Sequence, residues 1–168
     1  MSHRKHIRLT GYDYTSPNYY FVTVCTDYRR EIFTTRVSNK YGELFSNEVV
    51  AGPWPANNVK NTNIIEDKVN LIEDKFPAEI DFYCIMHDHL HLIIFLQVRQ
   101  GRATTLSTIV NAFKGWCTRE LGFRVFQPNF YEHIIRSEMS LDRIRRYILN
   151  NPLAEYRAIP WKSIDPVI

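Results

Sequence analysis

Three of the six histidines in this chain lie within five residues, in the segment MHDHLHLIIF at 86–95. Residues two apart on a strand project to the same face, so we expect His89 and His91 side by side, with Leu90 and Leu92 opposite. Two imidazoles at this spacing can bind one divalent cation. They are also found as ordinary polar residues on a solvated strand, and the spacing alone favours that second interpretation.

The residues after the pair weaken the solvated-strand interpretation. The run IIFL at 93–96 is apolar on both faces, which places the beginning of this strand near a core. Imidazoles buried there need a partner for each ring nitrogen. His87 has the same parity as the pair, but the short turn before His89 breaks the register. We therefore expect His87 to be a surface turn residue.

Two histidines are too few for a structural zinc site. An open site with two imidazoles and oxygen ligands suits a catalytic Mg²⁺ or Mn²⁺ that binds a phosphate group. The three cysteines, Cys25, Cys84 and Cys117, are far apart and in no Cys-x-x-Cys spacing. They are typical of reduced thiols in a cytoplasmic protein.

A second group of chemically capable residues lies in IRRYILNNP, at 144–152. On a helix, Tyr147 and Asn151 are four residues apart and share one face. A phenol becomes a nucleophile when its proton is removed, and an Asn carbonyl oxygen can bind a hard cation. The alternative is that Tyr147 lies at the edge of the core and Asn151 caps the helix, which is the commoner role for such residues.

Periodicity predicts the elements that position these residues. We expect strands at 19–26, 79–86, 89–97 and 130–135, and helices at 64–76, 104–121 and 139–150. A hairpin is predicted between 29 and 50, around 39–42, and a loop at 51–58. Pro77 should end the first helix, Ser137 or Ser140 should cap the last one, and Pro152 should end it near Asn150 or Asn151. This order predicts one α+β domain over residues 1–168, with an antiparallel sheet against which helices pack.

Composition sets limits on the class of protein. The chain has 168 residues, a net charge of +3 and 45% hydrophobic residues. No run of 18 apolar residues exists, and the basic N-terminus is not followed by an apolar stretch, so we expect neither a membrane span nor a signal peptide. The charge is compatible with a nucleic-acid partner but does not require one.

Four segments in this order resemble the REP-associated tyrosine transposases, a branch of the single-tyrosine HUH nucleases. They are RLTGYDYTSPNYYFVTVCT (8–26), MHDHLHLIIF (86–95), FYEHIIR (130–136) and YILNNP (147–152). The chain departs from the family at His87, where relatives usually have proline.

The resemblance implies a role for each matching residue. His89 and His91 would be the metal-binding pair of the HUH motif, Tyr147 the nucleophile, and Asn151 the third metal ligand. The fold would be ferredoxin-like or RRM-like.

The resemblance also implies the activity. The protein would be a metal-dependent endonuclease and strand transferase, acting on single-stranded or hairpin DNA through a 5′-phosphotyrosine and a free 3′-hydroxyl. Such an enzyme serves DNA transposition or recombination, as a monomer or a homodimer. Two alternatives stay open: a domesticated protein that binds DNA hairpins without cleaving them, and a metal phosphodiesterase that uses water, in which Tyr147 is structural.

Several other residues are candidates for DNA contact. Lys114 and the arginines around Tyr147, namely Arg143, Arg145 and Arg146, could contact phosphates, although each also suits a solvated helix face. Tyr131 is a competing nucleophile, for which core packing is the expected role. Four aromatic residues could stack on unpaired bases or form part of the sheet core: Tyr12, Tyr14, Tyr19 and Tyr20.

Overall fold

The computed structural model describes residues 16–39, 56–97 and 104–155. Within them, five strands form one antiparallel sheet in the order β2-β3-β4-β1-β5. The strands are β1 (Asn18–Cys25), β2 (Arg36–Asn39), β3 (Ala78–Ile85), β4 (His89–Leu96) and β5 (Tyr131–Ile135).

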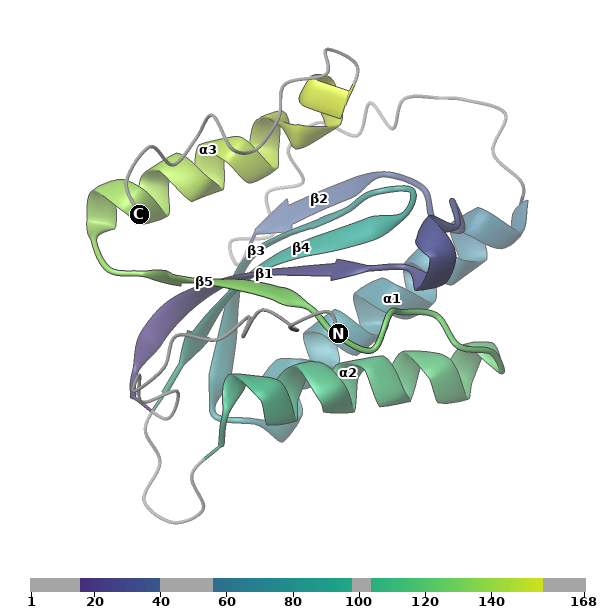
Figure 1. The fold of residues 1–168 in the computed structure, drawn as a ribbon, viewed down its shortest axis with the longest axis horizontal. Coiled ribbons are helices and arrows are strands. Elements are labelled where there is room, and N and C mark those ends of the chain that lie inside the picture. The colour runs from purple at the N-terminus through teal and green to yellow at the C-terminus, as the bar shows by residue number, and fades with distance from the viewer. Residues whose placement is uncertain (1–15, 40–55, 98–103, 156–168) are drawn as a thin grey trace, which may run out of the picture.

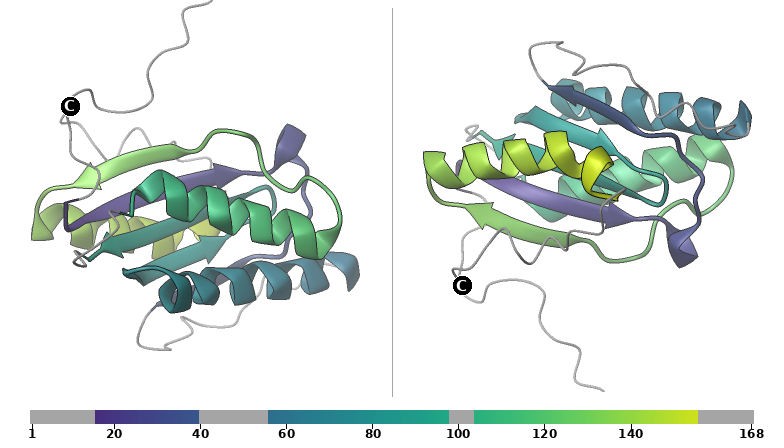
Figure 2. Two further views of the ribbon diagram at one scale, coloured as in Figure 1. Left: turned by 90° about the horizontal axis from the view of Figure 1, so that it is seen from below. Right: turned by 90° about the horizontal axis from the view of Figure 1, so that it is seen from above.

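Three helices cover the sheet on both faces. They are α1 (Ala56–Lys75), α2 (Leu106–Leu121) and α3 (Glu138–Glu155), and a 3-10 turn, η1 (Asp27–Arg29), follows β1. Helices α1 and α2 lie on one face and α3 lies on the other, as the two views in Figure 2 show from opposite sides (Figures 1 and 2).

The predicted α+β fold is confirmed. Without β2 and α3, the order along the chain is βαββαβ and the strands lie in the order β3-β4-β1-β5. This is the ferredoxin-like arrangement, in which each helical crossover skips one strand. Strand β2 is added at the edge, where it pairs with β3. The turn of the predicted hairpin at 39–42 lies mostly outside the described residues.

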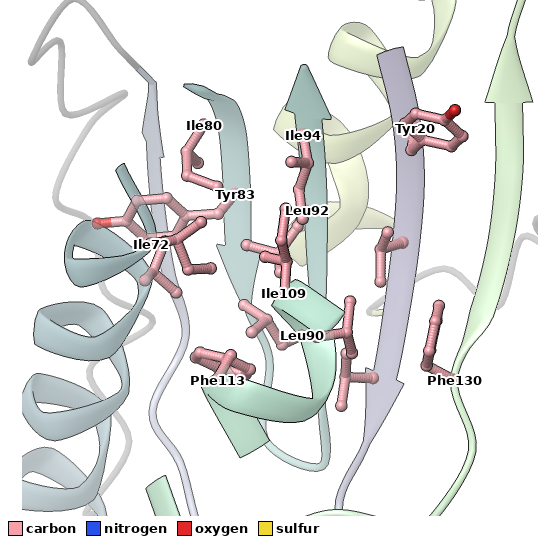
Figure 3. Close-up of a cluster of buried hydrophobic side chains, with 14 of the residues drawn as sticks. Tyr20, Ile72, Ile80, Tyr83, Leu90, Leu92, Ile94, Ile109, Phe113 and Phe130 are labelled. Atoms are coloured by element: carbon pink, nitrogen blue, oxygen red, sulfur yellow. The ribbon is translucent and has the colours of Figure 1, made fainter. Parts of the chain in front are cut away.

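The larger core fills the space between the sheet and the first two helices. Alternate residues of β1, Tyr20, Val22 and Val24, are fully buried there, because successive side chains of a strand point to opposite faces. Figure 3 shows their neighbours from β3, β4 and α2 packed in the same layer. The inward face predicted for α2 is confirmed: Leu106, Ile109, Val110, Phe113 and Cys117 are buried.

A smaller apolar cluster lies under α3. Leu141, Ile144 and Ile148 are buried on the helix, as predicted, and pack against Phe82 and Ile93 of the sheet. Ser137 is the cap that the sequence left open between two serines, since the backbone N–H of Ser140 donates to its hydroxyl oxygen at 3.2 Å.

A β-bulge ties α3 to the sheet. The pairing of β3 with β4 shifts between Ile80 and Phe82, so Asp81 is the extra residue. Its carboxylate is buried and accepts two hydrogen bonds from Arg145 of α3, at 2.7 and 2.8 Å. Removing one partner of such a buried pair costs about 3–5 kcal/mol, because the other charge stays desolvated. The pair therefore fixes α3 over β3.

Two predicted boundaries are wrong. Residues 56–58 were expected in a loop, yet α1 begins at Ala56, directly after Pro55 in sequence. A proline is tolerated at a helix start, where the first N–H groups have no partner in any case. Helix α3 continues through Pro152 to Glu155. Proline there removes one hydrogen bond and bends the helix, and Figure 1 shows the last turn of α3 leaning off the axis.

In the three described ranges, no helix has the length and apolar content that a bilayer crossing requires.

Candidate functional site

The two predicted histidines lie on the sheet face that α3 covers. Leu90 and Leu92 point into the larger core, so His89 and His91 project from β4 to the opposite side. His91 lies opposite Thr23 of β1, in the centre of the sheet. The centroids of the two imidazole rings are 4.7 Å apart. The two rings therefore lie side by side on one face of β4, as the spacing predicts.

Asp88 orients the ring of His89. The Nδ1 atom of His89 lies 2.6 Å from the Asp88 carboxylate, which can only accept, so Nδ1 carries the proton and Nε2 is left for another partner. The second carboxylate oxygen pairs with Nε of Arg29 at 2.9 Å. Burial raises the pKa of Asp88, but the hydrogen bond and charge of His89 and the charge of Arg29 outweigh it and hold the pKa below its ordinary value.

His91 is almost fully buried, with 5% of its surface exposed. Burial, followed by the charges of His89 and Arg29, lowers its pKa well below the ordinary value, so the ring is neutral at physiological pH. Its Nδ1 atom lies 2.9 Å from the Thr23 hydroxyl. Its Nε2 atom is buried and has no hydrogen-bond partner in the part of the chain described. An unsatisfied buried ring nitrogen costs about 1–3 kcal/mol and calls for a missing partner.

Tyr147 of α3 packs directly on this pair. The centroid of its ring lies 5.6 Å from that of His91 and 6.0 Å from that of Phe21. Phe21 also stacks on His91 at 5.2 Å, so the three rings form one cluster. Burial raises the pKa of the Tyr147 phenol, and the nearby Cys84 adds to the effect. The tyrosine and the histidines thus meet within a single chain.

A divalent cation fits this arrangement. Both imidazoles use Nδ1 for a protein partner, which is how metal-binding histidines are usually oriented, and Nε2 of each remains for a ligand role. Within the described ranges, no group of three or more His, Cys, Asp or Glu gathers for a metal. Further ligands would have to be of another type. Asn151 belongs to α3, one turn beyond Tyr147, and its side chain lies outside the described residues.

His87 occupies the connection between β3 and β4, as predicted. Its Nε2 atom lies 3.2 Å from the hydroxyl of Thr35, and its backbone carbonyl accepts from the N–H groups of Ile32 and Phe33. These contacts direct His87 toward the segment before β2 and not along β4.

The four cationic candidates are in different places. Lys114 lies on α2, and its ammonium donates to the backbone carbonyls of residues 127–129 at 2.8–3.1 Å. Burial lowers its pKa to about 8, so at neutral pH it remains a cation with three donors, all of them engaged. Arg145 is engaged with Asp81. Arg143 and Arg146 are exposed on α3. Exposure thus favours Arg143 and Arg146 as phosphate contacts.

Tyr131 is not a core residue, so that expectation was wrong. It is 63% exposed, because β5 is an edge strand and the residue lies at its beginning. It pairs with Thr23 across the sheet, on the face of the histidines. Tyr20 is buried, and Tyr19 packs against Phe95 at 4.7 Å. Tyr12 and Tyr14 lie outside the described residues.

Four residues that the sequence patterns did not indicate also contact this site: Asp88, Arg29, Thr23 and Phe21. An acidic residue directly before a metal-binding histidine is a readable signal for Asp88. Thr23 and Phe21 have the alternating parity of β1 but no feature that points to β4. Arg29 is distant in sequence from its partner, and only the fold brings the two together.

The chain is similar to a known protein by sequence and to solved structures by fold. A protein of Haemophilus influenzae, described only as uncharacterised, is 32% identical in an alignment of 175 positions that covers 90% of this chain and 89% of the relative. A REP-associated tyrosine transposase bound to a REP hairpin matches with a TM-score of 0.59 at 18% identity, over 88% of this chain and 74% of that one.

A candidate transposase from Deinococcus radiodurans aligns over 85% of this chain and 95% of that one, with a TM-score of 0.43 and 19% identity. No protein-family profile matches. The chain therefore shares its fold with the hairpin-bound transposase, and by sequence it belongs to the family of the Haemophilus influenzae protein.

Proposed function

We propose that this protein is a metal-dependent endonuclease and strand transferase that acts on single-stranded or hairpin DNA, with Tyr147 as nucleophile. One observation carries the proposal: a tyrosine ring packs on a buried histidine whose Nε2 atom lacks a partner among the described residues. The fold shared with a transposase bound to a REP hairpin supports the DNA substrate.

The proposed step is a transfer of a phosphoryl group. The Tyr147 oxygen forms a bond to phosphorus, the bond from phosphorus to the 3′ oxygen breaks, and the phenol proton ends on the released 3′-hydroxyl. The products are a 5′-phosphotyrosine and a free 3′ end. The phosphodiester energy is kept, so a 3′-hydroxyl can attack the phosphotyrosine and rejoin DNA without another energy source.

Other residues of the chain would bind the metal ion and orient its ligands. His89 and His91, with Asn151 as a third ligand, would hold Mg²⁺ or Mn²⁺, which when bound supplies positive charge to a phosphate oxygen in the transition state. Phe21, which stacks on His91, and Ile93 make this face of the sheet apolar. Thr23 and Asp88 fix the two rings.

Incubation of the protein with end-labelled single-stranded DNA and Mn²⁺ tests the proposal. A denaturing gel should show a covalent protein–DNA band together with a shorter strand. Cleaved DNA that is free of protein would identify a phosphodiesterase that uses water. DNA that is bound but never cut would identify a hairpin-binding protein.

Asp88 should control metal affinity without being a ligand. Replacing Asp88 with Ala removes the acceptor that orients His89, and such outer partners change metal affinity about 10- to 100-fold. Titration calorimetry with Mn²⁺ in the absence of DNA measures this directly. Asp74→Ala, at an exposed position on α1, is the matched control and should leave the affinity unchanged. Equal affinities for all three chains would remove Asp88 from the site.

Arg143 and Arg146 should bind the DNA backbone. The double alanine variant is expected to weaken binding and to reduce the slope of log affinity against log salt by about 1.4, or about 0.7 for each phosphate contact on a single strand. Fluorescence anisotropy across a salt series provides the slope. Lys60→Ala, which removes an exposed cation from α1, should leave the slope as it is. An unchanged slope in the double variant would exclude both arginines from the interface.

A further inference from the structure

A strained turn follows β1 beside the candidate site. Tyr28 has φ 56° and ψ 22°, and Arg29 has φ 55°. Both residues are therefore in the left-handed region, which is unfavourable for any residue with a Cβ atom. Among the described residues they are the only ones other than glycine with positive φ. Two such residues in succession persist only where the surrounding structure determines them.

Hydrogen bonds from both ends of the turn do so. The N–H of Thr26 donates to the Asp88 carbonyl at 2.8 Å, and the N–H of Asp27 donates to the Val125 carbonyl at 2.8 Å. The Thr26 hydroxyl lies 2.9 Å from the Asp88 carbonyl oxygen and 2.8 Å from that of Arg30. The turn is thereby bound to the β3–β4 connection and to the segment before β5.

The rigid turn presents an aromatic ring to solvent. Tyr28 is 87% exposed, the highest value among the large hydrophobic residues of the described chain. Among the described residues, nothing holds its side chain by a hydrogen bond or ring contact. The positive φ angles of this turn cost free energy, and the exposed ring gains no packing energy in return. The turn therefore does not benefit folding. The strained turn with its exposed ring instead indicates a place where a ligand binds.

Exposed cations beside the ring suit an anionic ligand. The side chains of Arg29 and Arg124 are 54% and 56% exposed. The acids beside them are largely covered by ion pairs: Asp88 with Arg29 at 2.9 Å, and Asp27 with Arg124 at 3.6 Å, both less than one fifth exposed. Glu31 is the exposed acid next to the turn. Cations interleaved with an open aromatic ring are the usual surface for unpaired nucleic acid.

We propose that the Tyr28 ring is a stacking platform for an unpaired base of the DNA strand that reaches the histidine pair. The proposal rests on the function proposed above and adds the position of a base. Arg29, the residue after Tyr28, pairs with Asp88, and Asp88 in turn binds His89, so two contacts link Arg29 to a candidate metal ligand. The stacked base therefore belongs to a nucleotide near the scissile phosphate.

Equilibrium binding to two probes tests the platform. One is a fluorescent single-stranded oligonucleotide of mixed sequence, and the other has the same length and backbone but carries only abasic sites. Tyr28→Gly and Tyr28→Ala should weaken binding to the first probe about 5- to 150-fold, the range for loss of one base–aromatic stack, and leave binding to the second unchanged. Tyr28→Phe and Tyr28→Trp should bind both probes as the unaltered chain does.

Glycine is the informative substitution, since it adopts positive φ without strain. Tyr28→Gly should therefore melt no lower than the unaltered chain, which separates loss of the ring from loss of the fold. Equal weakening on both probes, no weakening on either, or no binding of the first probe by the unaltered chain would overturn the platform.

The two proposals fail in different ways. Normal affinity in Tyr28→Gly together with a covalent adduct would reject the platform and keep the nuclease. Base-dependent loss of affinity in a chain that forms no adduct would keep the platform and reject the nuclease.

Discussion

Tyr147→Phe is expected to fold, bind DNA and bind divalent metal, yet to form no covalent adduct with DNA. Phenylalanine keeps the ring contacts with His91 and Phe21, at 5.6 and 6.0 Å, and deletes only the oxygen. Loss of a nucleophile lowers turnover by a factor on the order of 10⁴ or more. Denaturing gels of protein incubated with labelled DNA measure the adduct, and thermal melting verifies the fold.

Tyr131→Phe is the matched control. Tyr131 is exposed and lies on the same sheet face, paired with Thr23, so it is the tyrosine of β5 that a DNA strand would meet. We expect this variant to form the adduct at the normal rate. Mass spectrometry of digested adduct should place the nucleotide on Tyr147, and a nucleotide on Tyr131 would reverse the assignment.

Loss of either histidine of the pair should abolish metal-dependent cleavage. Outer partners of metal ligands already change affinity about 10- to 100-fold, so removal of a ligand should cost at least about 100-fold. His89→Ala is the cleaner variant because His91 is buried and bonded to Thr23, and its loss also leaves a cavity. Calorimetry with Mn²⁺ separates lost metal binding from lost activity.

His87→Ala should retain both metal binding and cleavage. Its ring contacts Thr35 before β2, and its removal leaves the rings of β4 in place. An inactive His87→Ala beside an active His91→Ala would mean that the register of the HxH pair has been misread.

His89, His91 and Tyr147 could be read from the sequence because each belongs to a regular element. Strand parity placed His89 and His91 on one face, and helical spacing placed Tyr147 on α3. Neither pattern could predict the contact between His91 and Tyr147, because β4 and α3 are distant in sequence and only the tertiary fold brings them together. The α+β class could also be predicted, because the periodic patterns give the order of strands and helices. Strand β2 has no clear alternation of polar and apolar residues.

The errors lie where tertiary contacts override local signals. Pro152 was expected to end α3, but a proline removes only one hydrogen bond, and the helix continues with a bend. Arg143, Arg145 and Arg146 looked equivalent in sequence. Asp81, at the β-bulge, forms a buried ion pair with Arg145. The hydrophobic periodicity of the sequence does not reveal this bulge. Tyr131 looked like a core residue because strand propensity does not reveal which strands are edges.

The two sheet faces differ in how firmly they hold their helices. Helices α1 and α2 share the larger core, whereas α3 rests on the smaller cluster and on the pair between Asp81 and Arg145. Elements with fewer buried contacts open locally at a lower free energy than the rest of a domain. Helix α3 is therefore the layer best able to lift while the sheet stays folded. It would carry Tyr147 away from the histidines. In the proposed strand transfer, that motion would give the attached DNA room to exchange ends without global unfolding.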